Sequence, residues 1–363
     1  MGLVAALGAA LVGALAFTAD PAPAVTHPGL EFVRRLQERA GFLTPLAQAV
    51  TTLGDIEFYV LVFPFLYWSL QRRLGIVAGV ALLLSAGLNS ILKLAFHTPR
   101  PSFIDPSLEL RPESTFGIPS GHAQNGVVIW GLLAAEARTR AVWAAAIAFI
   151  VALSWTRMHL GVHFAQDILV GWLVGALLLG TILRWRAPVG AWIAARSPRQ
   201  QRLLAFGASS ALIAAAGAVR FLSREWVVPG GWIGVDPTEP PMSLEAVVTT
   251  AAALFGFGAG IVFVRERGGF DTAGRVVPRL LRYLVGLVGV AAIFLGLDAV
   301  LPDGADPVAL VYRYVQFGLL GFWIGGVAPL VFVRLGIAPR ADGTRWRAGA
   351  ETSTEDPSLS EPS

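Results

Sequence analysis

The chain has 363 residues, of which 55% are hydrophobic and only 14% are charged, and its mean hydropathy is +0.63. Soluble globular proteins carry about 25% charged residues, so this composition excludes a water-soluble enzyme and, for most of the chain, intrinsic disorder. The apolar residues form long blocks, which is typical of a polytopic membrane protein. The net charge of +4 does not indicate a nucleic-acid partner, because the arginines lie mainly in short links between apolar blocks.

Ten apolar segments come close to the length of about 20 residues that a bilayer span needs. They cover roughly residues 2–18, 56–71, 74–96, 123–137, 140–156, 164–184, 203–222, 245–264, 280–300 and 309–334. We favour a retained helix for the first segment over a cleaved signal peptide, because it lacks a basic stretch before it. The sequence therefore predicts an all-α bundle with six spans in residues 1–190 and about four more in residues 203–336.

The basic residues predict the orientation of these spans. Most of the 28 lysines and arginines lie in alternate links, near residues 72, 138, 184–202, 265–282 and 334–347, and most of the 24 acidic residues lie in the other links. Positive links face the cytoplasm. We therefore expect a plasma-membrane protein with both termini in the cytoplasm, and with the links after residues 96 and 157 facing outside.

Three further features complete the organisation of the chain. Residues 30–50 place apolar side chains at helical spacing between charged ones, which predicts an amphipathic helix on the outer interface. Residues 341–363 are polar and rich in Ser, Glu and Pro, which predicts a disordered cytoplasmic tail. The chain has no cysteine, which excludes disulfides and thiolate chemistry. Nothing in the sequence indicates an oligomeric state.

The first chemical cluster follows the third predicted span. Lys93 is the only lysine of the chain and ends that span, and Arg100 follows seven residues later beside two prolines. Two fixed cations at one place suit a multiply charged anion. The alternative is that both residues only anchor a helix end at the membrane interface.

The second cluster, Ser120-Gly121-His122, stands directly before the span at 123–137. We expect Ser120 to be the N-cap of that helix, and Gly121 to let a ligand approach the backbone. Free N–H groups at a helix N-terminus bind anions, and His122 would stand beside such an anion as a proton donor. The alternative is an ordinary capped helix with an interfacial histidine.

The third cluster runs from Arg157 to Asp167 and contains His159 and His163. His163 and Asp167 are four residues apart, so the carboxylate can hold the imidazole N–H and fix its tautomer. An unpaired carboxylate inside a membrane is costly and is usually functional. We expect no metal, because cations rather than carboxylates flank the histidines. His159 is interpreted as a loop histidine with no partner.

Together, the three clusters resemble the signature of the type 2 phosphatidic acid phosphatase (PAP2) family: Lys-x6-Arg-Pro, Pro-Ser-Gly-His and Ser-Arg-x5-His-x3-Asp. Here the segments run from Lys93 to Pro101, from Pro119 to His122 and from Arg157 to Asp167, in the family's order. One departure is Thr156, which stands where the family usually has Ser. The resemblance covers residues 1–190, the family's six-span core, and does not extend to residues 203–336.

The resemblance implies a mechanism without a metal or cofactor. It makes His163 the nucleophile that forms a phosphohistidine, Asp167 its orienting carboxylate, and His122 the acid and base. The residues that it implies for holding the phosphoryl group are Lys93, Arg100, Ser120, Gly121 and Arg157. Because His163 must be neutral while His122 is protonated, a bell-shaped pH profile is expected.

The expected substrate is a lipid phosphate or diphosphate in the bilayer, such as undecaprenyl diphosphate or phosphatidic acid. Several alternatives use the same motifs: a lipid-linked phosphotransferase, a glucose-6-phosphatase-like enzyme for soluble esters, and a transporter or scaffold with a vestigial site. Vanadium haloperoxidases share the anion site but are not polytopic membrane proteins. We hypothesise that the outer loop at about 221–244 is a lid or lipid-entry wall, and the alternative is an ordinary interfacial belt of Trp and Arg.

Overall fold

The computed structural model describes residues 23–236, 241–302 and 304–341, and within these ranges all regular structure is helical. The α-helices are α2 (Pro23–Ala40), α3 (Thr44–Thr51), α4 (Ile56–Phe65), α5 (Arg72–Phe96), α6 (Pro101–Ile104), α7 (Gly121–Ala137), α8 (Arg140–His159), α9 (Ala165–Ala194), α10 (Pro198–Leu222), α11 (Glu245–Glu266), α12 (Val276–Asp298), α13 (Pro307–Phe322) and α14 (Ala328–Arg334). Two π-helical turns, η3 (Leu66–Leu70) and η5 (Trp323–Val327), continue α4 and α13. The predicted all-α membrane bundle is confirmed.

Seven of the ten predicted spans coincide with helices that are long and apolar enough to cross a membrane within the described ranges. The predicted span 56–71 forms α4 and η3, which meet the preceding helices at a bend of 51°. Helix α7, predicted at 123–137, has 17 residues and so lies at the lower limit of length for a span. The predicted span 2–18 and the predicted tail, apart from residue 341, lie outside the described residues.

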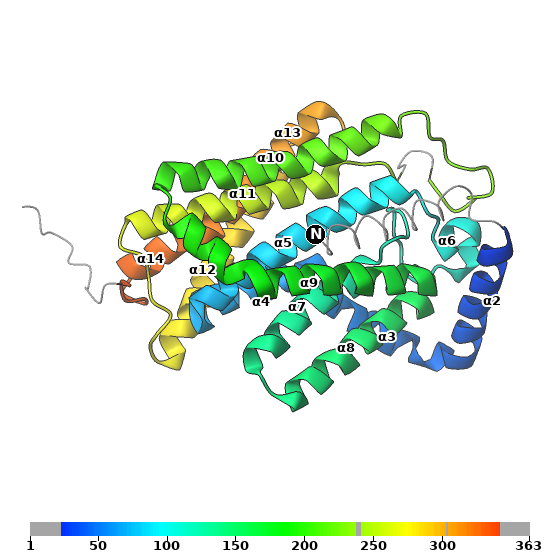
Figure 1. The fold of residues 1–363 in the computed structure, drawn as a ribbon, viewed down its shortest axis with the longest axis horizontal. Helices are drawn as coiled ribbons and strands as arrows, with labels where there is room; N and C mark the ends of the chain where they lie inside the picture. The colour runs from blue at the N-terminus through cyan, green and yellow to red at the C-terminus, as the bar shows by residue number, and fades with distance from the viewer. Residues whose placement is uncertain (1–22, 237–240, 303, 342–363) are drawn as a thin grey trace, which may run out of the picture.

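Helix α5 lies between two groups of helices (Figure 1). On one side it packs against α7 and α9, which α8 joins to form the core that carries the predicted site. On the other side it packs against α10 and α11. Helix α11 is the most buried of the extension, with 67% of its apolar window covered, against 11% for α10 and for α12. Hence α11 is the centre of the extension, and α10 and α12 form its exposed outer layer.

Small residues allow α11 and α13 to pack closely. A Cβ added at Gly256 would collide with the backbone of Gly318, and one at Gly260 would lie 2.8 Å from the nitrogen of Gly326. Close backbone contact of this kind is the usual role of glycine in spanning helices, where packing rather than the hydrophobic effect drives association. The sequence places these glycines in apolar spans, and the structure assigns them to helix packing.

The two π-helical turns meet and join the core to the extension. A π turn leaves backbone carbonyls without their usual helical partners. The hydroxyl of Tyr67 donates to the carbonyl of Gly325 at 2.9 Å, and Nε1 of Trp68 donates to the carbonyl of Ile324 at 2.9 Å. Both aromatic side chains are fully buried. Aromatic donors from η3 therefore satisfy the carbonyls that η5 exposes.

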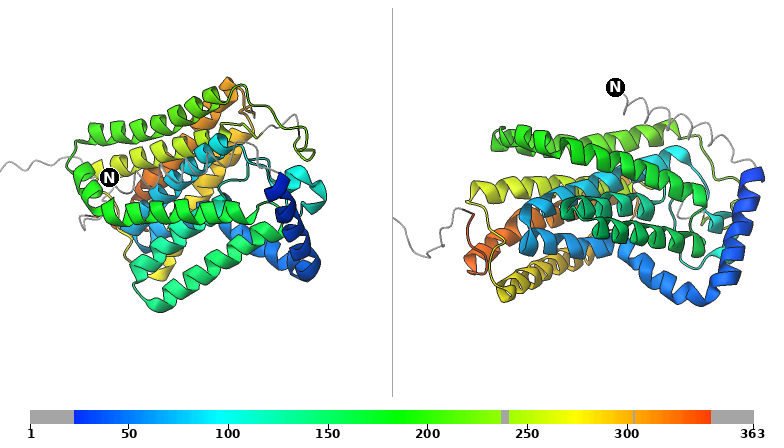
Figure 2. Two further views of the ribbon diagram at one scale, coloured as in Figure 1. Left: turned by 45° about the vertical axis from the view of Figure 1, so that its right-hand side comes forward. Right: turned by 60° about the horizontal axis from the view of Figure 1, so that its bottom comes forward.

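The segment predicted as one amphipathic helix over residues 30–50 is instead two helices, α2 and α3, separated by a short 3-10 turn at Gly41–Leu43. Helix α2 runs across the end of the bundle (Figure 2). Its apolar face is covered by protein, because Leu30 and Val33 pack against Leu108 and Phe164. The face expected to lie on the membrane interface therefore closes the end of the bundle that holds the predicted site.

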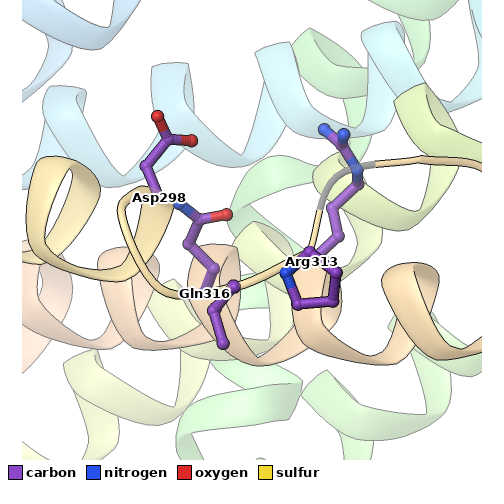
Figure 3. A pocket seen from close by; sticks show the side chains of 5 residues that line it. Asp298, Arg313 and Gln316 are labelled. Carbon is purple, nitrogen blue, oxygen red and sulfur yellow. The ribbon is translucent and has the colours of Figure 1, made fainter.

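Two hollows of the described residues lie elsewhere, one between α12 and α13 and one among α7, α8 and α9. The first, between α12 and α13, is lined by Asp298, Leu301, Pro302, Arg313 and Gln316 (Figure 3). Its volume of about 10 Å³ accommodates no more than one water, and Arg313 is already paired with Glu245 at 2.8 Å. The second, of about 270 Å³, is a groove with an entirely apolar lining on α7, α8 and α9. Neither can bind a phosphate.

Candidate active site

The structure brings all eight predicted site residues to one end of the core. Lys93 stands in the last turn of α5 and Arg100 in the link to α6. Ser120, Gly121 and His122 form the start of α7, and Arg157 lies in the last turn of α8. His163 precedes α9, whose first turn contains Asp167. The turn between α8 and α9 and the tight end of α5 at His97 thus bring three distant segments together.

His163 and Asp167 form a hydrogen-bonded pair that fixes the tautomer of the imidazole. Nδ1 of His163 lies 3.0 Å from Oδ2 of Asp167, and Nη1 of Arg100 lies 3.2 Å from Nε2 of His163. A guanidinium can only donate, so Nε2 is the acceptor and the proton resides on Nδ1. Burial, together with the charges of Arg100 and Lys93, holds the pKa of His163 well below its ordinary 6.5. The imidazole is therefore neutral, and the lone pair of its Nε2 is directed at Arg100.

Two buried arginines face a carboxylate that sequence analysis missed. Arg100 and Arg157 are each only 1% exposed. Nη2 of Arg100 lies 3.4 Å from Oε2 of Glu113, and Arg157 donates to its other oxygen. Burial by itself would raise the pKa of Glu113, but Arg100, Arg157 and Lys93 outweigh it and hold that pKa well below the usual carboxyl range. Glu113 is thus an ionised carboxylate that bridges the two guanidinium groups.

The third cation, Lys93, is held by the chain segment that follows Glu113. Its Nζ donates to Oγ1 of Thr115 at 3.1 Å and to the carbonyl of Phe116. Arg100 also donates to both oxygens of Thr115, with Nη2 at 2.9 Å from the hydroxyl. The positions of Lys93 and Arg100 therefore depend on residues 113–116, so the three cations and this segment form one network.

The start of α7 offers unused donors. Ser120 occupies the N-cap position as predicted, but its hydroxyl makes no capping hydrogen bond, which corrects the role expected for it. Its Oγ is fully buried and has no hydrogen-bond partner among the described residues. Nε of Arg157 is also buried without a hydrogen-bond partner there. Buried donors without partners are costly. Beside the free N–H groups of a helix N-terminus, they indicate a site built for an anion.

His122 has a carboxylate partner from a distant part of the chain. Its Nε2 lies 3.0 Å from Oδ1 of Asp55, and Oδ2 of Asp55 accepts from Arg111 at 2.7 Å. Burial would raise the pKa of Asp55, but the hydrogen bond from His122 and the charge of Arg111 lower it below the ordinary 3.8. An ionised Asp55 fixes the orientation of the His122 ring by accepting from its Nε2. The site therefore contains two His–Asp pairs, of which sequence analysis found one.

Two neighbouring residues have structural roles. His159, expected to have no partner, is fully buried at the end of α8, with its Nε2 2.9 Å from Oγ1 of Thr44. That expectation was wrong, because the bend after α2 brings Thr44 beside α8. Thr156, which stands in the place of the family's Ser, donates to the carbonyl of Leu153 within its own helix. Its hydroxyl therefore takes no part in the anion site.

Two family models and several curated proteins are similar to this chain. Residues 74–191 match the model of the PAP2 superfamily, and residues 248–340 match that of the PAP2 superfamily phosphatase, transmembrane extension. Undecaprenyl-diphosphatase of Sulfolobus acidocaldarius is 30% identical over 110 residues, which are 29% of this chain and 52% of that protein. Phosphatidylglycerophosphatase B of Bacillus subtilis is 32% identical over 100 residues, 25% of this chain and 47% of that protein.

A solved structure is also similar, the crystal structure of a transmembrane PAP2-type phosphatidylglycerolphosphate phosphatase from Bacillus subtilis. It aligns with a TM-score of 0.43 and 22% identity, over 52% of this chain and 96% of that one. The chain spans about half the length of the two curated relatives that it matches. All eight predicted site residues lie within the first matched range, and the extension largely coincides with the second. The chain is thus a multi-span membrane protein of the PAP2 superfamily, with the superfamily's transmembrane extension over residues 248–340.

Proposed function

We propose that this protein is a lipid phosphatase that hydrolyses a phosphomonoester or diphosphate lipid at the outer membrane face through a phosphohistidine on His163. One observation carries the proposal: the unprotonated Nε2 of His163 faces a buried cluster of cations beside a helix N-terminus with unused donors. Phosphoryl transfer depends mainly on positioning and charge stabilisation, which such a cluster supplies. The relatives, an undecaprenyl-diphosphatase and a phosphatidylglycerophosphatase, support a lipid substrate.

The proposed reaction has two balanced steps. Nε2 of His163 attacks the phosphorus, an N–P bond forms, and the P–O bond to the lipid breaks while His122 gives its proton to the leaving oxygen. Water then attacks the phosphorus, His122 takes the proton of that water, and the N–P bond breaks to release phosphate. Covalent catalysis divides one difficult displacement into two easier ones. Asp167 orients His163, and Asp55 orients His122.

The proposal is tested by phosphate release from purified protein in detergent with EDTA, using undecaprenyl diphosphate and phosphatidic acid separately. Release without an added acceptor is expected from at least one lipid, because protein side chains alone provide the charge stabilisation. Loss of activity in EDTA would contradict the proposal that the reaction needs no metal. If phosphate left the lipid only when a second lipid or sugar hydroxyl was added, the protein would be a phosphotransferase.

The depressed pKa of His163 predicts how activity depends on pH. The neutral form is the nucleophile, and a pKa lowered below 6.5 keeps it neutral at and above that pH. We therefore expect kcat/KM not to fall through protonation of His163 until the pH is below about 6.5. A profile of kcat/KM measured from about pH 4 to pH 9 checks this. A tenfold fall per unit already between pH 8 and pH 7 would contradict the assignment.

Glu113 competes with the substrate phosphate for Arg100 and Arg157. A phosphoryl group that binds both guanidinium groups must displace this carboxylate or share them with it. Glu113→Gln removes the charge and keeps the shape, so we expect inorganic phosphate to inhibit about tenfold more strongly. The inhibition constant of phosphate measures this. Glu109→Gln, an exposed glutamate nearby, serves as the control and should change little. Weaker inhibition in Glu113→Gln would mean that Glu113 mainly positions the arginines.

A further inference from the structure

The loop between α10 and α11 belongs to the added helices of residues 203–336, which are called the extension here, and it reaches the residues proposed to bind phosphate. We call residues 223–236 the clamp loop and residues 97–117 the phosphate loop. Trp226 and Trp232 of the clamp loop lie 5.7 Å apart between ring centroids and are both half-buried. They belong to a cluster in which α10 and α11 pack against the outer half of α5. The extension and the phosphate loop therefore share one apolar contact.

Trp226 contacts both ends of the phosphate loop. Its ring stacks on His97, with centroids 5.0 Å apart and planes at 20°, and meets the edge of Phe116 at 5.3 Å. His97 ends α5 with a φ of 48°, a left-handed conformation that is uncommon for residues other than glycine. Such conformations persist when the surrounding structure holds them. Stacking on Trp226 provides that support at the point where α5 turns toward Arg100.

Trp232 and its neighbour Gly234 contact the middle of the phosphate loop. The ring of Trp232 lies 5.8 Å from that of Phe103 and 6.3 Å from that of Phe116. The backbone N–H of Gly234 donates to the carbonyl of Phe103 at 3.0 Å. A Cβ at Gly234 would collide with the carbonyl of Ser102, so the two loops touch at the backbone. The phosphate loop is thus held at His97, Phe103 and Phe116.

These contact points adjoin the cation network. The carbonyl of Phe116 accepts from Nζ of Lys93, and its neighbour Thr115 accepts from both Lys93 and Arg100. The fully buried ring of Phe116 is enclosed by His97 and the two tryptophans. A displaced Phe116 would shift the oxygens that position Lys93. One buried side chain therefore connects the extension to the phosphate-binding cations.

We propose that the extension positions the phosphate-binding site: the clamp loop fixes the phosphate loop, so that affinity for the phosphoryl group depends on Trp226 and Trp232. The inference rests on the proposed function, because it takes Lys93 and Arg100 as the groups that bind phosphate. Trp226 and Trp232 are positioning residues, since they act through His97 and Phe116. Their rings contact His97, Phe103 and Phe116, so we expect the chemical step itself to be retained in their variants.

Trp226→Ala in the full-length protein tests the proposal, with inorganic phosphate as the probe. We expect the inhibition constant of phosphate and the KM of the lipid to rise about tenfold while kcat stays within about twofold. Trp226→Phe keeps an aromatic ring over His97 and should restore most of the affinity. Trp232→Leu should also weaken phosphate binding, and it provides a second test if Trp226→Ala does not fold.

Trp323→Ala is the matched control, because it removes a half-buried tryptophan from the opposite half of the extension, where Nε1 donates to the carbonyl of Gly286 at 3.0 Å. It should lower Tm and leave the inhibition constant of phosphate unchanged. The proposal is overturned if Trp226→Ala and Trp232→Leu leave that constant unchanged, or if Trp323→Ala raises it equally. A wild-type protein that neither binds nor releases phosphate would instead refute the proposed function.

Discussion

His163→Ala is expected to reduce phosphate release by at least about 10³-fold, because in the proposed mechanism the first P–O bond is broken only by attack from Nε2 of His163. The surrounding cations cannot replace a nucleophile, so substrate binding should survive while turnover is lost. In a rapidly quenched reaction with labelled lipid, wild-type protein should carry an acid-labile, alkali-stable phosphate on His163. The alanine variant should carry none.

Removal of the imidazole also leaves Asp167, which is only 1% exposed, with the backbone N–H of Phe164 but without its imidazole partner, which costs stability. His163→Gln therefore accompanies His163→Ala, because the amide can still donate to Asp167. Both variants should be inactive, and His163→Gln should melt closer to the wild type. His27→Ala, at an exposed histidine of α2, controls for a general effect of losing histidine. Activity within tenfold of wild type in a folded His163 variant would refute the phosphohistidine.

Periodicity and hydropathy predicted the spanning helices well, because a span of apolar residues has few other stable states. Helix α5 begins and ends within two residues of the expected 74–96. The π-helical turns that interrupt the spanning helices could not be predicted from the sequence. The π turn at Trp323–Val327 depends on donors from Tyr67 and Trp68, about 256 residues away in sequence. The position of α2 could not be predicted either, because its apolar face could pack equally well against a membrane surface or against the protein.

Motif spacing predicted the residues of the site that share a local segment, such as His163 and Asp167, which are four positions apart. It could not find Asp55 or Glu113, which act on His122 and on the arginines from other segments. Each is a single acidic residue in a link, and such residues are common. One signal was present: three buried cations in one place require a counter-charge. A search for acidic residues in the links on the same side would have included both.

Each His–Asp pair also contacts an arginine, which fixes the position or the protonation of one member of the pair. Arg111 holds Asp55 beside His122, and Arg100 engages the Nε2 of His163 opposite Asp167. In the first pair the cation keeps the carboxylate ionised, and in the second pair the cation requires an unprotonated Nε2. These different surroundings support the proposed division of roles, with His122 as the acid and His163 as the nucleophile.

Asp167→Asn is expected to lower kcat by roughly 10²- to 10³-fold with little change in KM, on the scale of losing one group that stabilises charge in the transition state. Oδ2 of Asp167 accepts from Nδ1 of His163 and from the backbone N–H of Phe164, both at 3.0 Å. An asparagine can place its amide oxygen at the position of Oδ2 and keep both hydrogen bonds, but the negative charge of the carboxylate is lost. Attack by Nε2 on phosphorus places a positive charge on the imidazole, which Asp167 stabilises and asparagine does not, so kcat falls while the fold remains.

Asp306→Asn controls for the substitution itself, because Asp306 is an exposed N-cap of α13 and asparagine caps a helix equally well. Its kcat should match the wild type. Steady-state kinetics on one lipid, with Tm measured for both variants, separates the loss of charge from unfolding. A loss that appeared in KM instead of kcat would make Asp167 a binding residue. A kcat within about tenfold of wild type would show that the charge of Asp167 contributes little to attack by His163.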